Sequence, residues 1–336
     1  MEKRAGQAMH AIEVDQLTKL YPPDIRAVDG VSFTVDEGEV YGFLGPNGAG
    51  KTTTIKMILT LTKPNSGGVH VYGVDALKSP SAVRQMMSYV PQDISADGDL
   101  SGYENLLIFS KLYFVSKKDR QERIGAALEY MGLTERASDL VKHYSGGMMR
   151  RLEIAQALVN RPRILILDEP SIGLDPAARR EVWQHIKRLN NEFKTTVFIT
   201  THDMLEADEL CDRIAIINAG KIVVTGSPSE LKKSIGEDVI QIKVSSFTNH
   251  VALPSELGTI TSTENGIISI VARDGERAIP RVLRVFEEGG ESVESISLSK
   301  PSLDDVFLKY AKIRIAEAET VSQSRSVRRS FRRHAR

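Results

Sequence analysis

The segment 45–52, which reads GPNGAGKT, constrains this chain more than any other feature of its sequence. It fits the pattern G-x-x-x-x-G-K-[ST], whose glycine-rich turn and following helix direct backbone N–H groups at a phosphate chain. The apolar run 40–44 before it predicts a buried strand, and residues 53–61 after it predict a helix. A chance match in a chain of this length has a probability on the order of one per cent. The sequence therefore predicts a nucleotide-binding loop.

Each loop residue has an expected role. Lys51 would reach the β- and γ-phosphates, and the Thr52 hydroxyl would ligate Mg²⁺. The residues expected to contact the nucleotide are Gly45, Pro46, Asn47, Gly48, Ala49, Gly50, Lys51, Thr52 and Thr53.

Length and composition place the chain among globular proteins with two domains, or with one large domain and an appendage. Its 336 residues are 41% apolar and 26% charged, and the formal net charge is zero. A single cysteine, Cys211, excludes an internal disulfide and fits a reducing compartment, and it is expected to be a small buried residue near a helix end. No apolar run approaches the ~20 residues that span a bilayer, and the N-terminus lacks a signal-peptide core. A cytoplasmic protein that docks on a membrane through a partner is therefore predicted.

Strands alternate with helices after the phosphate loop, which predicts an α/β fold with a parallel sheet flanked by helices. Two short strands, 11–17 and 31–36, precede the loop, and a hairpin-like stretch near 67–73 follows it. The segment 101–132 is helical in pattern, and its first helix, 103–115, is apolar nearly all round. Such a helix is either buried by internal packing or covered by a partner.

A second module begins between residues 227 and 235, where the composition changes. Its expected order is βαββαβ, which suggests a ferredoxin-like α+β domain with a closing helix over 303–310. The predicted strands are 238–244, 259–263, 267–272 and 291–298, and the predicted helices are 252–257 and 275–288. This half contains no evident catalytic constellation.

Carboxylates follow the buried strand 164–167, at the edge of a parallel sheet where ligands bind. Asp168 would hold Mg²⁺, and Glu169 would polarise the water that attacks the γ-phosphorus. The alternative, an acidic cap leading into Pro170, is the weaker interpretation beside a phosphate loop. Gln92 and His202 also follow strand ends, so they could serve the metal or the attacking water and the γ-phosphate, respectively.

A second anion site is suggested by Ser145, Gly146 and Gly147. A helix that opens with these residues presents uncovered backbone N–H groups and a hydroxyl. Taken alone, the tripeptide is more simply an ordinary helix start.

The order of these parts resembles the ATP-binding cassette (ABC) ATPases over about residues 11–230. The resemblance implies that 45–52 is the Walker A loop, that Thr52 and Gln92 serve Mg²⁺, that Asp168 is the Walker B aspartate and that Glu169 is the catalytic base. It also implies the signature at Ser145–Gly147, the D-loop at Asp175, the switch histidine at His202 and an adenine-stacking role for Tyr21. The segment 144–148 reads YSGGM where the family usually has LSGGQ, but the phosphate-facing residues are kept.

Two domains of this family pack head to tail, so that each signature caps the ATP bound by the other Walker A loop. The resemblance therefore implies ATP and Mg²⁺ as cofactors and a second ATP-binding subunit as partner. No catalytic position departs from the family pattern, so both sites of a homodimer are expected to hydrolyse ATP.

The C-terminal segment 301–308, PSLDDVFL, resembles the tail module of ABC-2 exporters of the daunorubicin-resistance type. This resemblance implies an ATPase that powers export of a drug, antibiotic, lipid or glycan through a separate membrane permease. The predicted location is peripheral, on the cytoplasmic face of the cell membrane. The predicted domains are a flexible start at 1–10, the ATPase at 11–230 with a helical subdomain near 93–143, an accessory domain at 231–312 and a disordered tail at 313–336.

The main alternative is a soluble ABC ATPase that acts on nucleic acid or ribosomes. It draws on the tail 321–336, which contains six arginines and no acidic residue. Lys51 and Ser145 are only 94 residues apart and no heptad run separates them, unlike the long coiled coil of repair ATPases. A solvated, disordered end is the first interpretation of the tail, anionic lipid contact the second and nucleic acid the third. A small-molecule kinase leaves the signature and His202 unexplained.

Overall fold

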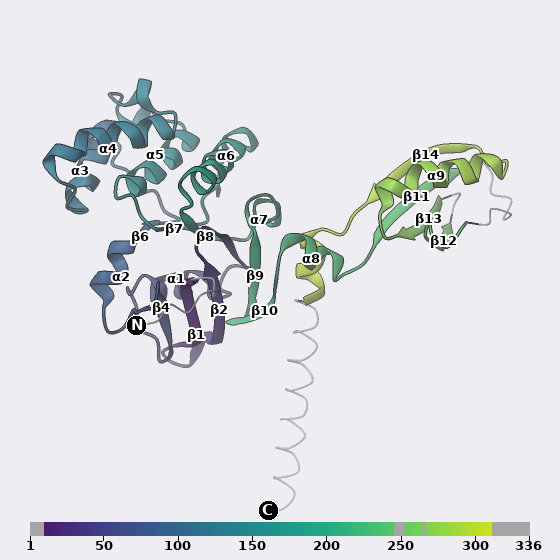
Figure 1. Cartoon of the computed structure of the whole chain (residues 1–336), viewed down its shortest axis with the longest axis horizontal. Coiled ribbons are helices and arrows are strands. Elements are labelled where there is room, and N and C mark those ends of the chain that lie inside the picture. The colour runs from purple at the N-terminus through teal and green to yellow at the C-terminus, as the bar shows by residue number, and fades with distance from the viewer. Residues whose placement is uncertain (1–9, 245–252, 265–266, 311–336) are drawn as a thin grey trace, which may run out of the picture. The chain divides into compact units, whose positions relative to one another are not determined.

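In the computed structural model, which describes residues 10–244, 253–264 and 267–310, the chain divides into the units Met1–Pro228 and Ser229–Arg336 (Figure 1). The expectations for residues 1–9 and 313–336 lie outside the described residues, whereas His10 already belongs to the first strand. None of the helices within the described ranges combines the length and the apolar character needed to cross a bilayer.

A six-stranded sheet organises the first unit, and its strands follow the spatial order β10-β9-β3-β8-β7-β6. All neighbouring pairs are parallel except β10 with β9, as the alternation of strands and helices predicted. Every residue of β3, β7 and β8 is buried, because other elements, helices and an antiparallel sheet, cover both faces of the parallel sheet. The strands are β3 (Val40–Leu44), β6 (Met87–Val90), β7 (Ile164–Asp168), β8 (Thr196–Thr201), β9 (Arg213–Asn218) and β10 (Lys221–Gly226).

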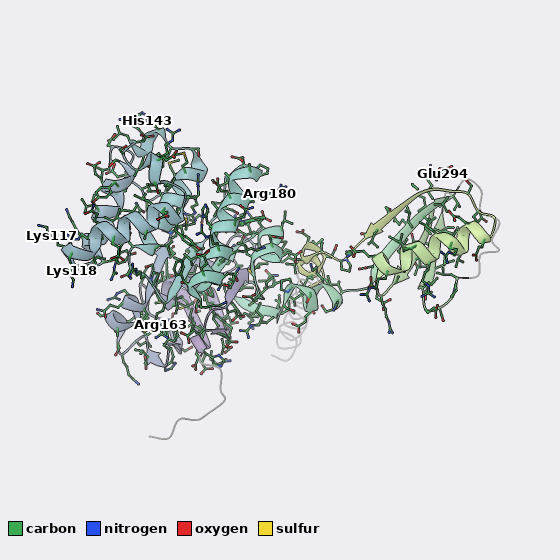
Figure 2. All side chains as sticks on the ribbon, turned by 45° about the horizontal axis from the view of Figure 1, so that its top comes forward. Lys117, Lys118, His143, Arg163, Arg180 and Glu294 are labelled. Carbon is green, nitrogen blue, oxygen red and sulfur yellow. The ribbon has the colours of Figure 1, made fainter. Side chains whose placement is uncertain are left out.

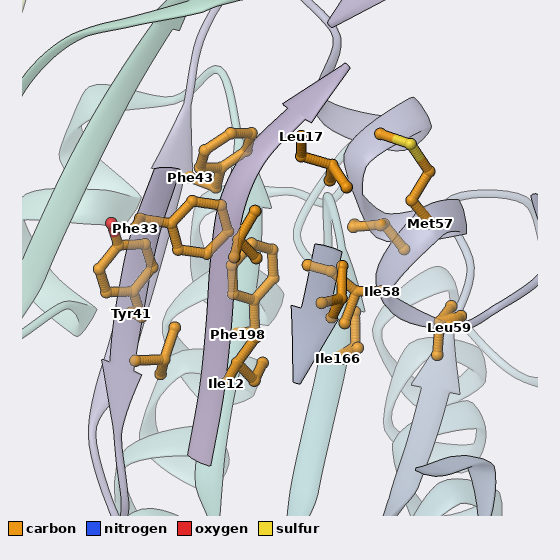
Figure 3. Packing of buried hydrophobic residues seen from close by; sticks show 14 of the residues in the cluster. Ile12, Leu17, Phe33, Tyr41, Phe43, Met57, Ile58, Leu59, Ile166 and Phe198 are labelled. Carbon is orange, nitrogen blue, oxygen red and sulfur yellow. The ribbon is translucent and has the colours of Figure 1, made fainter. Parts of the chain in front are cut away.

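An antiparallel sheet of order β2-β1-β4-β5 packs on the same core. Figure 3 shows the contact: Phe33 from the antiparallel sheet meets Tyr41, Phe43 and Phe198 of the parallel sheet, with ring centroids 5.3 to 5.9 Å apart. These offset and tilted aromatic pairs add to the stabilisation from buried area. The strands are β1 (His10–Tyr21), β2 (Ile25–Asp36), β4 (Ser66–Val71) and β5 (Val74–Asp75), so the predicted strand 31–36 in fact begins at Ile25.

Four helices of the first unit, α3, α5, α6 and α7, begin at a side-chain cap. Ser101 and Glu104 form a reciprocal capping box at the start of α3, and Asp175 caps α6 with Pro176 at the first helical position, as predicted. Cys211 is buried directly after α7, also as predicted. The helices are α1 (Lys51–Ile58), α2 (Pro80–Met86), α3 (Gly102–Leu112), α4 (Lys117–Tyr130), α5 (Gly146–Leu158), α6 (Pro176–Phe193) and α7 (Met204–Leu210), with 3₁₀ turns η1 (Thr134–Arg136) and η2 (Val141–His143).

The second unit is a four-stranded antiparallel sheet of order β12-β13-β11-β14 with α9 on one face. Strand β13 lies between β11 and β12, which is the split arrangement expected for a ferredoxin-like domain. Residues 303–310 are helical, as predicted. The elements are α8 (Pro228–Lys233), β11 (Asp238–Val244), β12 (Thr259–Glu264), β13 (Ile267–Ala272), α9 (Gly275–Glu288) and β14 (Val293–Ser299).

One predicted helix of this unit is wrong. Residues 253–257, the described part of the predicted helix 252–257, form a turn. The Leu257 amide donates to Pro254 O at 2.9 Å, and the Leu257 side chain is buried in the core of the unit. Gly258 follows with φ 134°, a value that no helix residue adopts, so the chain leaves this turn directly after Leu257.

Candidate active site

The phosphate loop leaves β3 at Gly45 and enters α1 at Lys51. Gly50 has φ 110°, and a Cβ atom there would lie 2.4 Å from Ala27 O, so only glycine fits this turn. The amides of Gly48, Gly50, Lys51 and Thr52 donate to no acceptor among the described residues. A run of unpaired amides at a helix N-terminus suits the oxygens of a phosphate chain.

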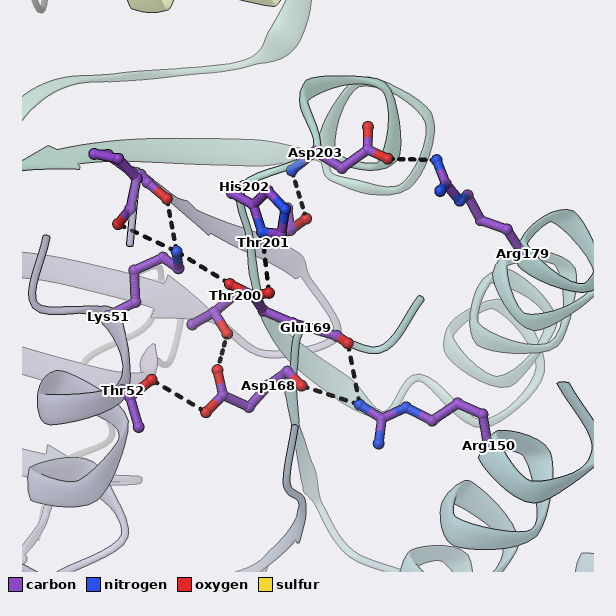
Figure 4. Close-up of polar contacts among 12 residues, drawn as sticks. Lys51, Thr52, Arg150, Asp168, Glu169, Arg179, Thr200, Thr201, His202 and Asp203 are labelled. Atoms are coloured by element: carbon purple, nitrogen blue, oxygen red, sulfur yellow. Dashed lines mark hydrogen bonds and ion pairs between the residues drawn. The ribbon is translucent and has the colours of Figure 1, made fainter. Parts of the chain in front are cut away.

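Lys51 is buried although it is charged. Its Nζ donates to Gly45 O at 2.6 Å and to Pro46 O at 3.4 Å, and it lies 3.2 Å from Glu169 Oε1 (Figure 4). A buried ammonium group needs such partners, because desolvation without them is costly. The lysine of the loop is thus folded back onto the loop's own carbonyls and onto the carboxylate predicted to be the base.

Asp168 ends β7 and is buried among hydroxyl groups. Thr52 Oγ1 and Tyr89 Oη donate to Asp168 Oδ2 at 3.4 and 3.3 Å, and Thr200 Oγ1 bonds Oδ1. Burial, together with the charge of Asp168, raises the pKa of Tyr89, so its phenol remains a donor at neutral pH. Tyr89 and Thr200 were not predicted as site residues, although both lie on strands that flank β7.

Glu169 follows Asp168 with φ 50°, and its amide donates to Thr200 O at 2.9 Å. Its buried carboxylate lies between two side chains: Lys51 at Oε1, and His202 with Nδ1 3.0 Å from Oε2 (Figure 4). No well-directed hydrogen bond reaches Oε2. His202 itself is about half exposed. The structure therefore brings together Lys51, Thr52, Asp168, Glu169 and His202.

The residues around Thr52 and Asp168 fit a nucleotide-bound Mg²⁺ better than a resident metal. Among the described residues, no group of three or more His, Cys, Asp or Glu side chains could hold an ion. Mg²⁺ in nucleotide sites uses one or two carboxylates with substrate phosphates and water, which one aspartate and one hydroxyl match. Gln92 is exposed in the loop after β6, and in the described structure it contacts neither Thr52 nor Asp168.

The segment Ser145–Gly147 forms a separate feature at the N-terminus of α5. Ser145 caps the helix by accepting from the Met148 amide at 3.2 Å, and both Ser145 and Gly146 are exposed. Gly147 is buried against α6, where an added Cβ would lie 2.8 Å from Ala178 Cβ. In the described structure this segment makes no hydrogen bond with the phosphate loop of its own chain.

Asp175 lies beside this segment as the cap of α6 and is exposed. Its carboxylate accepts from the amides of Ala177 and Ala178 at 2.9 and 3.0 Å. Hydrogen bonds from the Ala178 and Ala177 amides lower the Asp175 pKa, so the cap is charged at neutral pH.

Tyr21 is the last residue of β1 and is partly exposed. Lys19 Nζ lies 5.3 Å from the centroid of its ring. The ring is not covered by core residues, so it is available to stack on a planar base.

Arg150 is a site residue that the sequence did not reveal. From α5 its guanidinium donates to Pro91 O at 2.6 Å, Pro170 O at 2.8 Å, Asp168 O at 3.0 Å and Glu169 O at 3.2 Å. It also pairs with Glu153 at 3.0 Å, and both side chains are buried. One side chain thus joins α5 to the segments that follow β6 and β7.

Glu206 is a second buried group that was not predicted. It accepts from Trp183 Nε1 at 2.9 Å and also bonds Thr201 and Ser171. Burial raises its pKa, and these hydrogen bonds only partly oppose the shift. Glu206 therefore links Trp183 of α6 to Thr201, at the end of β8, and to Ser171, in the segment that follows β7.

Comparisons with known proteins agree with this geometry. The chain matches two family descriptions, "ABC transporter" over residues 28–172 and "ATP-binding protein DrrA1-3-like, C-terminal domain" over residues 226–311. The daunorubicin/doxorubicin resistance ATP-binding protein DrrA of Streptomyces peucetius is 40% identical over 307 residues, which are 90% of this chain and 92% of that protein. The Nod factor export ATP-binding protein I of Rhizobium meliloti is 38% identical over 305 residues, 89% of this chain and 87% of that protein.

A solved structure is also similar in fold to part of this chain. The dimeric post-hydrolysis state of the ATP-binding cassette MJ0796, bound to ADP and Pi, has a TM-score of 0.58 and 28% identity. The similarity covers 64% of this chain and 98% of that one.

Proposed function

This chain belongs to the ABC transporter ATP-binding proteins, in the branch of the daunorubicin resistance proteins, and from that membership we infer that it hydrolyses ATP to power an ABC-2-type exporter. The chain has the parts of a nucleotide site in two separate places. Lys51, Asp168 and Glu169 gather beside the unpaired amides of the phosphate loop, while the Ser145 segment lies elsewhere on the surface. We expect an ATPase with both features to bind its nucleotide at an interface with a second subunit.

We assign the roles of the gathered residues from their contacts. Thr52 and Asp168, helped by Gln92, would hold Mg²⁺, and the loop amides with Lys51 would bind the phosphates of ATP. When bound, Mg²⁺ neutralises charge on the β- and γ-phosphates. The three hydroxyl donors fix the Asp168 carboxylate in one orientation. Tyr21 would stack on the adenine ring.

Glu169 is the proposed general base. In the structure its carboxylate is paired with Lys51 at 3.2 Å, and His202 lies 3.0 Å away. A γ-phosphate offers Lys51 a more highly charged acceptor, so Lys51 would turn to the phosphate and release Glu169 Oε1. The released carboxylate can then take a proton from the attacking water, while His202 orients it and bonds the γ-phosphate.

A second copy of the chain is the proposed partner for the nucleotide. The Ser145–Gly147 segment and Asp175 are exposed together and do not reach their own phosphate loop. In a head-to-tail pair they would cap the ATP of the other copy. Because ATP binds the closed pair better than either copy, it drives the association.

The permease contact is proposed on α3. Internal packing buries Leu106 of this helix but leaves Ile108 and Leu112 exposed, and Phe114 just after the helix is 92% exposed. An exposed apolar patch of this kind is typical of a protein interface. Docking there would hold the chain at the cytoplasmic face of the membrane, and the arginine-rich tail would add attraction to anionic lipid. The proposed domain limits are 11–230 for the ATPase and 231–312 for the accessory domain.

The test is a mild-detergent pull-down of the full chain from its native membrane, with and without ATP. We expect a multi-span membrane protein to be recovered, and substitution of Phe114 by Asp to reduce that recovery. The matched control is Leu61→Asp, an exposed apolar residue after α1. Recovery of ribosomes or DNA instead, unaffected by Phe114→Asp, would favour the nucleic-acid alternative.

A further inference from the structure

The first unit contains a cavity of about 620 Å³ at the edge of the sheet opposite to the phosphate loop. Arg163 and Thr195 line the cavity, and they come directly before β7 and β8, whereas Asp168 and Thr201 end those strands. Parallel strands have their beginnings at one edge of the sheet and their ends at the other. The cavity is therefore separate from the nucleotide site.

Much of the cavity wall is apolar and aromatic. Ala127 and Tyr130 come from α4, Leu158 from α5, and Leu189 and Phe193 from α6. The rings of Tyr130 and Phe193 are 5.3 Å apart at their centroids, and Phe193 is mostly exposed at the mouth. The volume falls in the range of small-molecule sites, which are lined mainly by such side chains.

The remaining wall is cationic. Arg163, labelled in Figure 2, pairs with Glu37 at 2.8 Å, and its guanidinium carbon lies 3.4 Å from the ring centroid of Tyr72. The other cationic side chains are Arg123, Arg161 and Lys194, and Glu37 is the one acidic side chain in the lining. Within the described residues, neither Arg123 nor Lys194 pairs with a carboxylate. The cavity thus has an excess of positive charge.

One polar atom of the lining lacks a hydrogen-bond partner among the described residues. Arg123 Nε is buried and no acceptor of ordinary geometry faces it in the described structure, whereas Tyr130 Oη, also buried, faces the carboxylate of Glu192. Arg123 reaches only Val159 O, through Nη1 at 3.5 Å. Burial, with the nearby carboxylate of Glu192, raises the pKa of Tyr130 to about 12, so its hydroxyl is protonated at neutral pH. Buried donors without acceptors are rare in folded proteins and indicate a missing acceptor.

We propose that this cavity binds a small amphiphilic anion, with a ring-bearing apolar body against Leu158, Tyr130 and Phe193 and a carboxylate, sulfonate or phosphate group that accepts from Arg123. The cationic wall disfavours a positively charged ligand. The ligand would contact α4 as well as the residues that precede β7 and β8, so it would join the helical segment to the core. This inference does not depend on the assignment of the ATPase or of the exporter.

The test is a fluorescence titration of the full, nucleotide-free chain with 8-anilinonaphthalene-1-sulfonate and with its uncharged counterpart, N-phenyl-1-naphthylamine. We expect saturable binding of both dyes, and an affinity for the sulfonate that falls about tenfold or more in Arg123→Gln, since a buried charged hydrogen bond is lost. The affinity for the uncharged dye should stay the same in that variant. Arg120→Gln on the same helix is the matched control, because Arg120 does not line the cavity.

A second variant, Ala126→Trp, fills the cavity from an exposed position of α4 and should remove the binding of both dyes. The far-ultraviolet circular dichroism spectrum should remain that of the parent protein. Sulfonate binding that is equal in the parent, Arg123→Gln and Ala126→Trp overturns the proposal. So does displacement of the dye by ATP in direct competition, because the anion would then occupy the phosphate loop.

Discussion

Two regions of the first unit present backbone amides at a helix N-terminus: the phosphate loop and the start of α5. They differ in the burial and in the charge of the side chains around them. At the loop, Lys51, Asp168 and Glu169 are buried and bonded to one another's segments. At α5, the exposed Ser145 and Gly146 offer a hydroxyl and backbone amides, with no charged side chain in the first turn. The first site is prepared for chemistry within one chain. The second has no buried charged group in its first turn, which fits the proposal that it caps a nucleotide bound by another copy.

Among the variants that test this difference between the two regions, Glu169→Gln should have the largest effect, a loss of ATP hydrolysis. The amide cannot act as a base, so turnover should fall by about 10²- to 10⁴-fold while ATP binding persists. Steady-state ATP hydrolysis and equilibrium nucleotide binding measure the two parts separately. Normal hydrolysis in this variant would show that another group is the base.

Substitution of Ser145 by Arg tests the exposed site. In the Glu169→Gln background, ATP should no longer produce a dimer, because the arginine occupies the surface that caps the second nucleotide. Each monomer should still bind ATP, since its own phosphate loop is intact. Size-exclusion chromatography with light scattering gives the oligomeric state, and Ser116→Arg, an exposed serine before α4, is the control. Loss of ATP binding by the monomer would contradict the separation of the two sites.

Arg150 connects the two regions, and Arg150→Ala should destabilise the fold. The change leaves Glu153 and several carbonyls buried without a donor, which costs about 3–5 kcal/mol when one partner of a buried pair is removed. Urea unfolding measures the loss. Arg136→Ala, which breaks an exposed pair with Asp139, should cost about 0–1 kcal/mol. Equal losses in the two variants would show that Arg150 contributes only a surface contact.

Glu206→Gln should have the smallest effect, and the effect should depend on pH. The folded pKa of Glu206 is raised, so the folded state binds the proton more tightly, and stability falls as pH rises from the unfolded pKa through the folded one. Glutamine removes this titration and keeps an acceptor for Trp183. The free energy of unfolding of the variant, relative to the parent, should therefore increase with pH across that window. Urea unfolding at several pH values measures it, and a difference that does not change with pH would refute the assignment.

Much of the nucleotide site could be predicted because its residues occupy short, local patterns. The apolar runs 40–44 and 164–167 end in a glycine turn and in two carboxylates, and parallel pairing brings those ends to one edge. Asp175 followed by proline likewise predicts a helix start from local chemistry alone. These features need no knowledge of distant contacts.

The rest depends on contacts that the sequence order conceals. Arg150 is one of two adjacent arginines, and only the packing of α5 shows that it reaches Pro91 and Pro170. The predicted helix 252–257 failed because Leu257 is buried in the core of the second unit and Gly258 leaves the turn with φ 134°. The cavity beside α4 is lined by residues from Glu37 to Thr195, which no local pattern connects.

The four carbonyls that bind Arg150 have a mechanical consequence. Pro91, Asp168, Glu169 and Pro170 belong to two segments far apart in sequence, yet one guanidinium fastens both to α5. A force that tilts α5 must either carry these carbonyls along or break the hydrogen bonds of a buried guanidinium. A movement of α5 would therefore shift Glu169 and the loop after β6 together.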